Sequence, residues 1–462
     1  MSGSVLPSSF RDPSGFLFVR EGTLYRQVNL SFREQFDALS ATGLERALVE
    51  AGLLIPHEEV DISLAAAPGA YKVLRPEPVG FVSYPYEWCF GQLRDAALAT
   101  LAVQAMALDH EMSLRDATAY NIQFHRGRPI LVDTLSFEKL RAGQPWVAYR
   151  QFCQHFLAPL ALMSYRDVRL GRLSQIHIDG VPLDLAAEML PARARLRPSL
   201  FLHVFAHARS QRRHERDSSK GRAIKSGRAF SAQAFRGLIG SLRKAVAALS
   251  WRPKDSSWAG YYEEAESYRP EALQHKKSIV ASFLEAAAPR SVWDLGANTG
   301  LFSRLASDGG IPTVAFDFDA AAVEANYRTV VDRSERDLLP LVMDLNAPSP
   351  DIGWANQERR SLADRGPVDL VLALALIHHL AIGNNVSFER LAEFMRRLCS
   401  WLVVEFVPKS DPKVQELLSH REDVFHGYTQ EGFEAAFDRY FVTQRREPIP
   451  DSERLLYLMR GR

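Results

Sequence analysis

The chain has 462 residues, of which 47% are hydrophobic and 24% are charged, and its formal net charge is +1. This length predicts two or three domains, and the composition is that of a soluble globular protein rather than a disordered chain. So small a net charge offers no overall attraction to nucleic acid or to a membrane surface.

Neither targeting nor metal chemistry is indicated by the simplest sequence features. The amino terminus is polar and lacks the apolar core of a signal peptide, and no apolar run reaches the roughly 18 residues that span a bilayer. Cys89, Cys153 and Cys399 lie far apart and form no CxxC pair, so neither a disulfide framework nor a zinc site is expected. We therefore expect a cytoplasmic protein.

The first predicted domain spans residues 1–206. Residues 90–108, FGQLRDAALATLAVQAMAL, predict a long buried helix, and the segment SLRDATAYNIQFHRGRPILVDTLSF that follows predicts a loop and a hairpin turning at residues 126–128. In that segment Asp116 and Asn121 are spaced as D-x-x-x-x-N, and Asp133 ends the next strand. The order resembles the catalytic and metal-binding loops of protein kinases and small-molecule phosphotransferases.

The resemblance implies an α+β, kinase-like domain with a specific division of roles. Asp116 would orient an acceptor hydroxyl, while Asn121 and Asp133 would hold magnesium beside the phosphates of ATP. However, Leu114 stands where that family has His, TLS follows the final Asp in place of F-G, and no glycine-rich phosphate loop is found. Only Arg26 or Lys72 is available to contact the phosphates.

Three interpretations of this domain therefore remain open. It is a degenerate domain that recognises an acceptor or regulates access, an active phosphotransferase using Mg-ATP, or a fold in which Asp116 and Asn121 only cap a buried loop. Apart from Asn121 and Asp133 in the active case, no metal ligand is predicted.

Residues 207–270 predict a basic linker and a helical lead-in to the last domain. Residues 207–228 concentrate Arg and Lys with Ser and Gly, which is typical of a solvated surface stretch, although a site for a phosphate-bearing partner is the alternative. Residues 230–249 repeat apolar positions at helical spacing. The aromatic residues that follow form either a lid over a ligand or packing on the last domain: Trp258, Tyr261, Tyr262 and Tyr268.

In the last domain, residues 271–462, the segment SVWDLGANTGLFSRLASDGG, which begins at Ser291, predicts a strand, a tight loop and a helix. Glycine in such a loop tolerates positive φ and lets a ligand approach the backbone. A nucleotide cofactor held there needs an acceptor for its ribose hydroxyls at the end of the next strand. Asp317 takes this place, and Asp319, the competing candidate, is better suited to cap the helix that follows.

Further strands are predicted in chain order. LPLVMDL ends at Asp344, whose carboxylate is suited to the exocyclic amine of an adenine, with Leu345 or its backbone covering the ring. VDLVLALALIHHL and WLVVEFVP are continuous apolar runs, as in parallel strands buried on both faces. His378 and His379 close the first of these two and Glu405 the second, so each is a candidate base, and packing is the alternative role for the histidines.

The run D-L-G-A-N-T-G resembles the first motif of class I S-adenosylmethionine (SAM) dependent methyltransferases and lacks the glycines of a dinucleotide-binding loop. The resemblance implies a Rossmann-like domain with a mixed seven-stranded sheet and helices on both faces, whose last strands are FDRYFVTQRREP and RLLYLMRG. It assigns these residues to SAM: Asp294, Gly296, Asn298 and Gly300 to the methionine end, Asp317 to the ribose, and Asp344 with Leu345 to the adenine.

SYPYEW before the long helix, together with DLGANTG, resembles bacterial methyltransferases of the NoeA type, a group named after a rhizobial nodulation protein. The resemblance implies a methyltransferase but says little about its acceptor. Small molecules or glycans are the leading acceptors, with nucleic acid and membrane insertion not expected. A bifunctional kinase and methyltransferase is one rival hypothesis, and a noncatalytic cofactor-binding partner protein is another. The sequence does not specify the acceptor or the oligomeric state.

Overall fold

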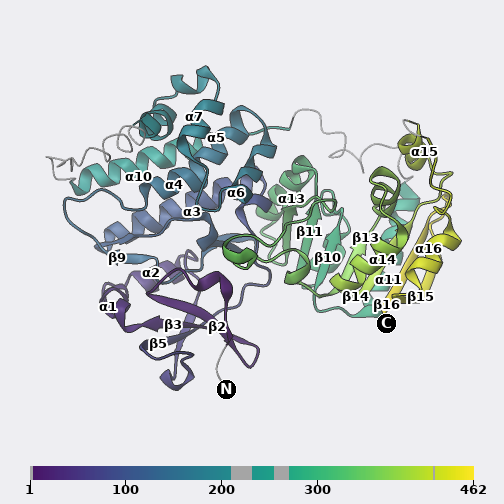
Figure 1. Ribbon diagram of the computed structural model, residues 1–462, viewed down its shortest axis with the longest axis horizontal. Helices are drawn as coiled ribbons and strands as arrows, with labels where there is room; N and C mark the ends of the chain where they lie inside the picture. The colour runs from purple at the N-terminus through teal and green to yellow at the C-terminus, as the bar shows by residue number, and fades with distance from the viewer. Residues whose placement is uncertain (1–3, 210–230, 254–269, 420–421) are drawn as a thin grey trace. The chain divides into compact units, whose positions relative to one another are not determined.

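The computed structural model describes residues 4–209, 231–253, 270–419 and 422–462 (Figure 1). The chain forms two compact units, which we describe separately. The first contains Met1–Arg252 and Asp351–Arg359, and the second contains Pro253–Pro350 and Arg360–Arg462.

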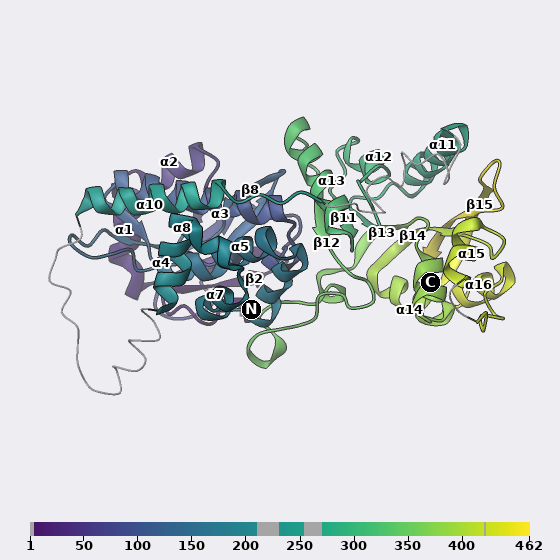
Figure 2. The ribbon, with the colours of Figure 1, turned by 90° about the horizontal axis from the view of Figure 1, so that it is seen from above.

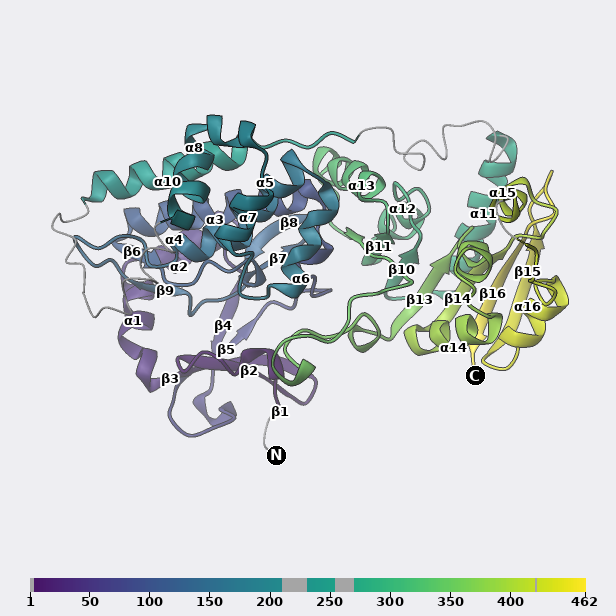
Figure 3. The same ribbon diagram turned by 45° about the horizontal axis from the view of Figure 1, so that its top comes forward.

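The first unit begins with a five-stranded antiparallel sheet in the order β1-β2-β3-β5-β4. Its strands are β1 (Ser4–Val5), β2 (Gly15–Arg20), β3 (Thr23–Asn29), β4 (His57–Val60) and β5 (Ala70–Pro76). Helices α1 (Arg33–Ala41) and α2 (Leu44–Glu50) separate β3 from β4. The strands lie at one end of the unit and its mainly helical part at the other, as Figure 3 shows.

The helical part of this unit is built around the predicted long helix, α3 (Phe90–Asp109), which is buried along most of its length. The predicted hairpin is also confirmed, since β7 (Ile122–His125) pairs with β8 (Arg128–Leu131). Strand β6 (Met112–Leu114) pairs with β9 (Phe137–Lys139) and frames the loop between them. The smaller helices are α4 (Tyr149–Phe152), α5 (Ala158–Tyr165), α6 (Leu173–Ile176), α7 (Leu183–Met189) and α8 (Pro198–Leu200).

Helix α10 (Ala232–Ala247) belongs to the first unit, whereas its sequence suggests a lead-in to the last domain. Its apolar stripe, which includes Phe235, Ile239 and Leu242, is buried, and the helix packs against α3. An apolar stripe is covered by whichever partner the tertiary fold provides, and its sequence does not name that partner. The aromatic cluster at 258–268 and nearly all of the basic stretch lie outside the described residues.

The second unit contains a seven-stranded sheet in the order β12-β11-β10-β13-β14-β16-β15. All neighbouring pairs are parallel except the two that involve β16, which runs antiparallel to β14 and β15. The strands are β10 (Val292–Leu295), β11 (Thr313–Asp317), β12 (Leu338–Val342), β13 (Val368–Ala373), β14 (Cys399–Phe406), β15 (Phe441–Pro448) and β16 (Leu455–Gly461). The predicted mixed seven-stranded fold is therefore confirmed.

Helices cover both faces of this sheet. Figure 2 shows α11 (Pro270–Ala287), α12 (Ser303–Ser307) and α13 (Ala320–Arg333) on one side, and α14 (Phe388–Leu398) and α16 (Gln430–Phe437) on the other, with α15 (Pro412–Leu418) near β14. Val280 and Phe283 of α11 pack with Leu370, Val403 and Leu458 of the sheet in one apolar core. The central strands are buried on both faces, which explains why their sequences are continuous apolar runs.

The fourth strand of the sheet is shorter than predicted. β13 ends at Ala373, and the chain then turns at Ala375, whose φ is +49°. A left-handed residue cannot continue an extended strand. His378 and His379 therefore lie beyond β13, in a short helical segment that starts at Ile377 and continues as the π-helix His379–Gly383, rather than at the end of the strand itself.

Candidate functional site at the carboxyl edge of the sheet

The loop after β10 bends because three of its residues adopt left-handed backbone conformations. The φ angles of Gly296, Asn298 and Gly300 are +77°, +51° and +81°, a region that glycine enters without strain and that asparagine tolerates better than most residues. The N–H groups of Gly296 and Ala297 donate to the carbonyl of Phe316 at 2.8 and 2.9 Å. The loop is thereby fixed onto the end of β11.

Neighbouring side chains leave no room for a larger residue at the second glycine of this loop. A Cβ added at Gly300 would lie 2.5 Å from Nδ2 of Asn326. The Asn326 side chain is buried, and neither of its amide atoms has a hydrogen-bond partner among the described residues. A buried polar group with unused bonding capacity thus lies directly beside the loop.

The structure brings the three predicted carboxylates to the same edge of the sheet. Asp294 lies in β10, Asp317 is the last residue of β11, and Asp344 follows the end of β12 by two residues. Because β12, β11 and β10 are parallel neighbours, their carboxyl ends lie side by side. The N–H of Met343 donates to the carbonyl of Asp317 at 2.8 Å and so joins two of these ends.

Asp317 is buried and accepts two backbone hydrogen bonds. Its Oδ2 accepts from the N–H of Asn298 at 2.7 Å, and its Oδ1 accepts from the N–H of Asp319 at 2.8 Å. Burial raises the pKa of this carboxyl to about 6, against the effect of the backbone donors. Such a group gains from any ligand that donates further hydrogen bonds to its ionised form.

Asp294 connects β10 to the start of α12 through a side-chain hydrogen bond. Its Oδ2 accepts a hydrogen bond of 2.6 Å from Ser303 Oγ, at the start of α12. Burial raises the pKa of Asp294 to about 7, and the charge of Asp317 acts in the same direction. The structure therefore gives Asp294 a protein partner and a place in fixing the loop, while its predicted contact with a cofactor remains a prediction.

Asp319 caps α13, as predicted, because its side chain accepts from the N–H of Ala321 at 2.8 Å. Between Asp317 and Asp319 lies Phe318, which the sequence reasoning missed and whose exposed fraction is 61%. An exposed aromatic ring next to a carboxylate at a strand end is suited to cover a planar ligand group. The available sequence signal was its position directly after Asp317.

The third strand end is more open. The carboxylate of Asp344 accepts from the N–H of Asn346 at 2.9 Å and from its Nδ2 at 3.1 Å. Asp344 and Leu345 are both partly exposed. Both therefore retain surface that a ligand at this edge can contact.

The two candidate histidines differ in their surroundings. The rings of His378 and His379 lie 4.1 Å apart between centroids. His378 is fully buried, and neither of its ring nitrogens has a hydrogen-bond partner among the described residues. Burial lowers its pKa well below the ordinary value and lowers the pKa of His379 to about 4. Both imidazoles are therefore neutral near pH 7.

Glu405, the third candidate base, is held in a buried group of charges. Its Oε2 accepts from Lys276 Nζ at 2.6 Å and from the N–H of Ala375 at 2.8 Å. Arg454 Nη1 lies 3.4 Å from Oε1. A carboxylate with two cations and a backbone donor is a strong acceptor already in use, so Glu405 is poorly placed to take a proton.

Lys276 and Arg454 are members of the site that sequence reasoning missed. Lys276 lies on the buried face of α11 with Ala272, Ile279 and Val280. A lysine at helical spacing within an apolar stripe was the available signal. Arg454 lies between β15 and β16, and nothing local in the sequence distinguishes it from a surface arginine.

The first unit brings the kinase-like residues together. Asn121 Nδ2 donates to Ser136 Oγ at 3.2 Å, and this hydroxyl donates to Asp133 Oδ2 at 2.5 Å. Burial raises the pKa of Asp116, and the charge of Asp133 adds to this effect. The Oδ1 of Asp116 accepts from the N–H of Thr118 at 3.0 Å, so this carboxylate also shapes its own loop.

The basic candidates in this unit have protein partners. Arg26, on β3, donates to Asp133 Oδ1 at 2.5 Å, and both side chains are largely buried. Lys72, on β5, pairs instead with Glu59. Strands β2 and β3 are joined by a two-residue turn, Glu21 and Gly22, which holds no glycine-rich motif. A cation on Asp133 competes with the metal that the resemblance places there.

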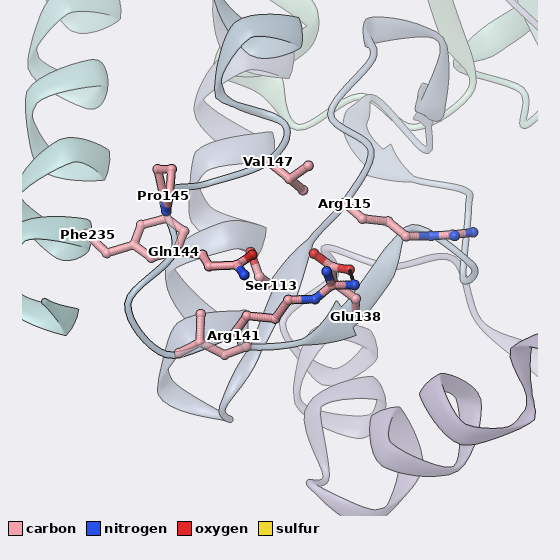
Figure 4. A pocket seen from close by; sticks show the side chains of 9 residues that line it. Ser113, Arg115, Glu138, Arg141, Gln144, Pro145, Val147 and Phe235 are labelled. Carbon is pink, nitrogen blue, oxygen red and sulfur yellow. Dashed lines mark hydrogen bonds and ion pairs between the residues drawn. The ribbon is translucent and has the colours of Figure 1, made fainter. Parts of the chain in front are cut away.

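A separate cavity of about 130 Å³ opens in the first unit near α10 and β9 (Figure 4). Arg141 and Glu138 form an ion pair across it at 3.2 Å, and Phe235 reaches it from α10. None of Asp116, Asn121 and Asp133 lines this cavity. It is therefore not a nucleotide site of the predicted kind.

Two further findings concern metals and membranes. Within the described ranges, no three His, Cys, Asp or Glu side chains are grouped so that they could hold a metal ion. The helices in these ranges include none with the length and apolar character needed to cross a bilayer.

Known proteins give one strong comparison. No protein-family model matches the chain. Among solved structures, the bifunctional kinase-methyltransferase WbdD is 14% identical, with a TM-score of 0.28 over 41% of this chain and 39% of that one, so the match spans about two fifths of WbdD. The magnesium protoporphyrin IX methyltransferase of Synechocystis PCC 6803 is 14% identical, with a TM-score of 0.30 over 46% of this chain and 87% of that one. Likeness at this level carries no argument about activity.

The strong comparison is with nodulation protein NoeA of Rhizobium meliloti (strain 1021). The two chains are 34% identical over 453 residues, which cover 97% of this chain and 94% of NoeA. The resemblance noted in SYPYEW and DLGANTG is therefore confirmed along nearly the whole length of both proteins, and the chain belongs to the NoeA family.

Proposed function

We propose that the protein is a class I SAM-dependent methyltransferase whose second unit binds the cofactor and whose acceptor is a hydroxyl group of a small molecule or glycan. The observation that carries the proposal is the sheet edge formed by β10, β11 and β12. There a glycine loop with left-handed residues meets two buried carboxyl groups, Asp294 and Asp317, and the exposed ring of Phe318.

The residues at this edge fit the parts of SAM in order. The carboxylate of Asp317 has lone pairs left after its two backbone bonds, which suit the ribose hydroxyls. Phe318 and Leu345 offer apolar surface for the adenine, and Asp344 an acceptor for its amine. The loop from Gly296 to Gly300 would carry the methionine part, because glycine lets a ligand approach the backbone closely.

Bound SAM supplies an electrophilic methyl group carried on a sulfonium. The chain would contribute the proton acceptor for a hydroxyl nucleophile. We assign this role to His378, because its imidazole is neutral and its nitrogen atoms are free of protein partners in the described structure. A neutral imidazole has one donor and one acceptor, which matches a hydroxyl group. His379 is the second candidate.

For the first unit we propose recognition of the acceptor or regulation of access to it. The Arg26–Asp133 ion pair supports this role over phosphotransfer, since it uses the carboxylate that a magnesium ion would need. A bifunctional kinase and methyltransferase would require this pair to open. A thermal-shift titration with Mg-ATP tests the rival directly, because a ligand of the native state raises the melting temperature.

Titration calorimetry with SAM tests the cofactor assignment. The wild-type protein should bind SAM, and Gly296→Val should bind at least tenfold more weakly, because valine disfavours φ = +77° and its Cβ would lie 3.3 Å from Leu376 Cδ1. Absence of binding by folded wild-type protein would refute the proposal. Incubation with SAM labelled in the methyl group and a small-molecule cell extract then separates an enzyme from a noncatalytic SAM-binding protein.

A further inference from the structure

Four charged side chains meet in the interior of the second unit. Lys276 comes from α11, Glu405 from β14, Asp411 from the start of α15, and Arg454 from the connection between β15 and β16. Lys276, Glu405 and Arg454 are 1%, 0% and 3% exposed. Arg454 joins the two carboxylates, since its Nε donates to Asp411 Oδ2 at 2.6 Å and its Nη1 lies 3.4 Å from Glu405 Oε1.

Stability alone does not account for such a group. Removing ions from water is so unfavourable that well-packed apolar residues often stabilise a core as well or better. Here burial lowers the pKa of Lys276, and the neighbouring Glu405 opposes this effect. The Glu405 carboxylate therefore opposes the loss of charge on Lys276 that burial favours.

The cluster is connected to the backbone of the turn after β13. Glu405 Oε2 accepts both Lys276 Nζ and the N–H of Ala375, at 2.6 and 2.8 Å. Ala375 has a φ of +49°, a left-handed conformation that is strained for an L-residue other than glycine. Strained backbone persists where its surroundings hold it in place. Glu405 holds the backbone of Ala375 in place, and Ala375 lies three residues before His378.

His378 is a titratable group on which three of these charges act electrostatically. Beyond its neighbour His379, the groups that act on it are Arg454, Glu405 and Lys276, which come from three other elements. The imidazole is fully buried and both of its nitrogens are unpaired among the described residues. Leaving a buried polar group unpaired is unfavourable, so a ligand that forms a hydrogen bond with His378 recovers this energy.

We propose that Lys276, Glu405 and Arg454 are positioning residues, which fix the turn at Ala375 and so place His378 correctly toward the acceptor. The inference rests on the proposed function, because the proposed function assigns the role of proton acceptor to His378. It changes the role of Glu405 from a candidate base to the residue that holds the base in place. No contact between these three side chains and SAM is required.

The test uses the full-length protein with ¹³C-labelled histidine. The pH titration of His378 is followed by NMR, and its signal is identified by its loss in His378→Gln. In Lys276→Met one facing positive charge disappears while Glu405 remains, so the titration midpoint of His378 should rise by about one pH unit. Lys277→Met is the matched control, since Lys277 is the next residue of α11 and makes no ion pair in the described structure. It should leave the midpoint unchanged.

A second variant avoids leaving the Glu405 carboxylate buried without its lysine partner. Lys276→Met/Glu405→Gln removes both charges and keeps an amide oxygen that can accept from Ala375, so the midpoint should fall back below that of Lys276→Met. If neither variant moves the midpoint, the ion pairs are only structural and the inference is wrong. Calorimetry with SAM gives an independent readout. The Kd of Lys276→Met for SAM should lie within about threefold of the wild-type value. If the wild-type protein does not bind SAM, the cofactor assignment is overturned and the role of the charged cluster is not.

Discussion

Substitution of Asp317 by asparagine should separate the stability of the second unit from its affinity for SAM. The carboxylate accepts from the N–H groups of Asn298 and Asp319 at 2.7 and 2.8 Å. Asparagine has one oxygen acceptor and one NH₂ donor, so one of these two N–H groups loses its partner. A hydrogen bond to a charged group contributes about 1.5–3 kcal/mol to stability.

The same substitution removes an unfavourable buried charge. Burial raises the pKa of Asp317 from the ordinary value of 3.8 to about 6. A rise of about two pH units corresponds to a cost of about 3 kcal/mol for the ionised form at pH 7. The gain and the loss nearly cancel, and we expect the free energy of unfolding to change by less than about 1.5 kcal/mol.

Affinity for SAM should behave differently. An amide accepts from only one side, so at least one charge-assisted bond to a ribose hydroxyl is lost, about 1.5–3 kcal/mol or roughly 10- to 150-fold in Kd. Calorimetry at pH 7.5 and a denaturant melt measure the two quantities. Asp319→Asn is the control, because asparagine also caps helices and should leave affinity within about threefold. If Asp317→Asn binds SAM as tightly as wild type, or Asp319→Asn shows the larger loss, the ribose assignment to Asp317 is wrong.

The glycine loop, the buried carboxyl groups and the Arg26–Asp133 ion pair each allow a further prediction. Gly300→Ala should lower the free energy of unfolding by about 2–4 kcal/mol in a denaturant melt, because its Cβ would lie 2.5 Å from Asn326 Nδ2. Gly310 has a similar φ and open space around it, so the control Gly310→Ala should lower the free energy of unfolding by only about 1 kcal/mol. Folded Asp294 and Asp317 retain protons that the unfolded chain releases near pH 4, so the free energy of unfolding should decline as pH rises from about 4 to about 7. Over the same range the affinity for SAM should increase up to tenfold per pH unit as Asp317 ionises near pH 6. Flat profiles of stability and affinity would contradict this prediction. Mg-ATP should leave the melting temperature of wild type unchanged, since Arg26 already occupies Asp133, and a rise of several degrees would favour the phosphotransferase instead.

Local sequence determined most of the second unit. Continuous apolar runs predicted its parallel strands, because strands covered on both faces need no polar side. The glycine loop and the acidic strand ends were also predictable, since in a parallel sheet successive carboxyl ends meet at one edge whatever the remaining details. For the first unit, the spacing of Asp116, Asn121 and Asp133 was enough to predict a cluster.

Only the tertiary structure decided which of these groups already have partners. Asp133 is neutralised by Arg26 over 107 positions of sequence, and Glu405 by Lys276 over 129. Burial depends on the whole fold, so no local pattern showed that His378 is enclosed without hydrogen-bond partners among the described residues, or that Glu405 is already engaged by two cations. The packing of α10 on α3 was undetermined for the same reason: an apolar stripe predicts that a helix face will be covered, and the three-dimensional arrangement alone selects what covers it.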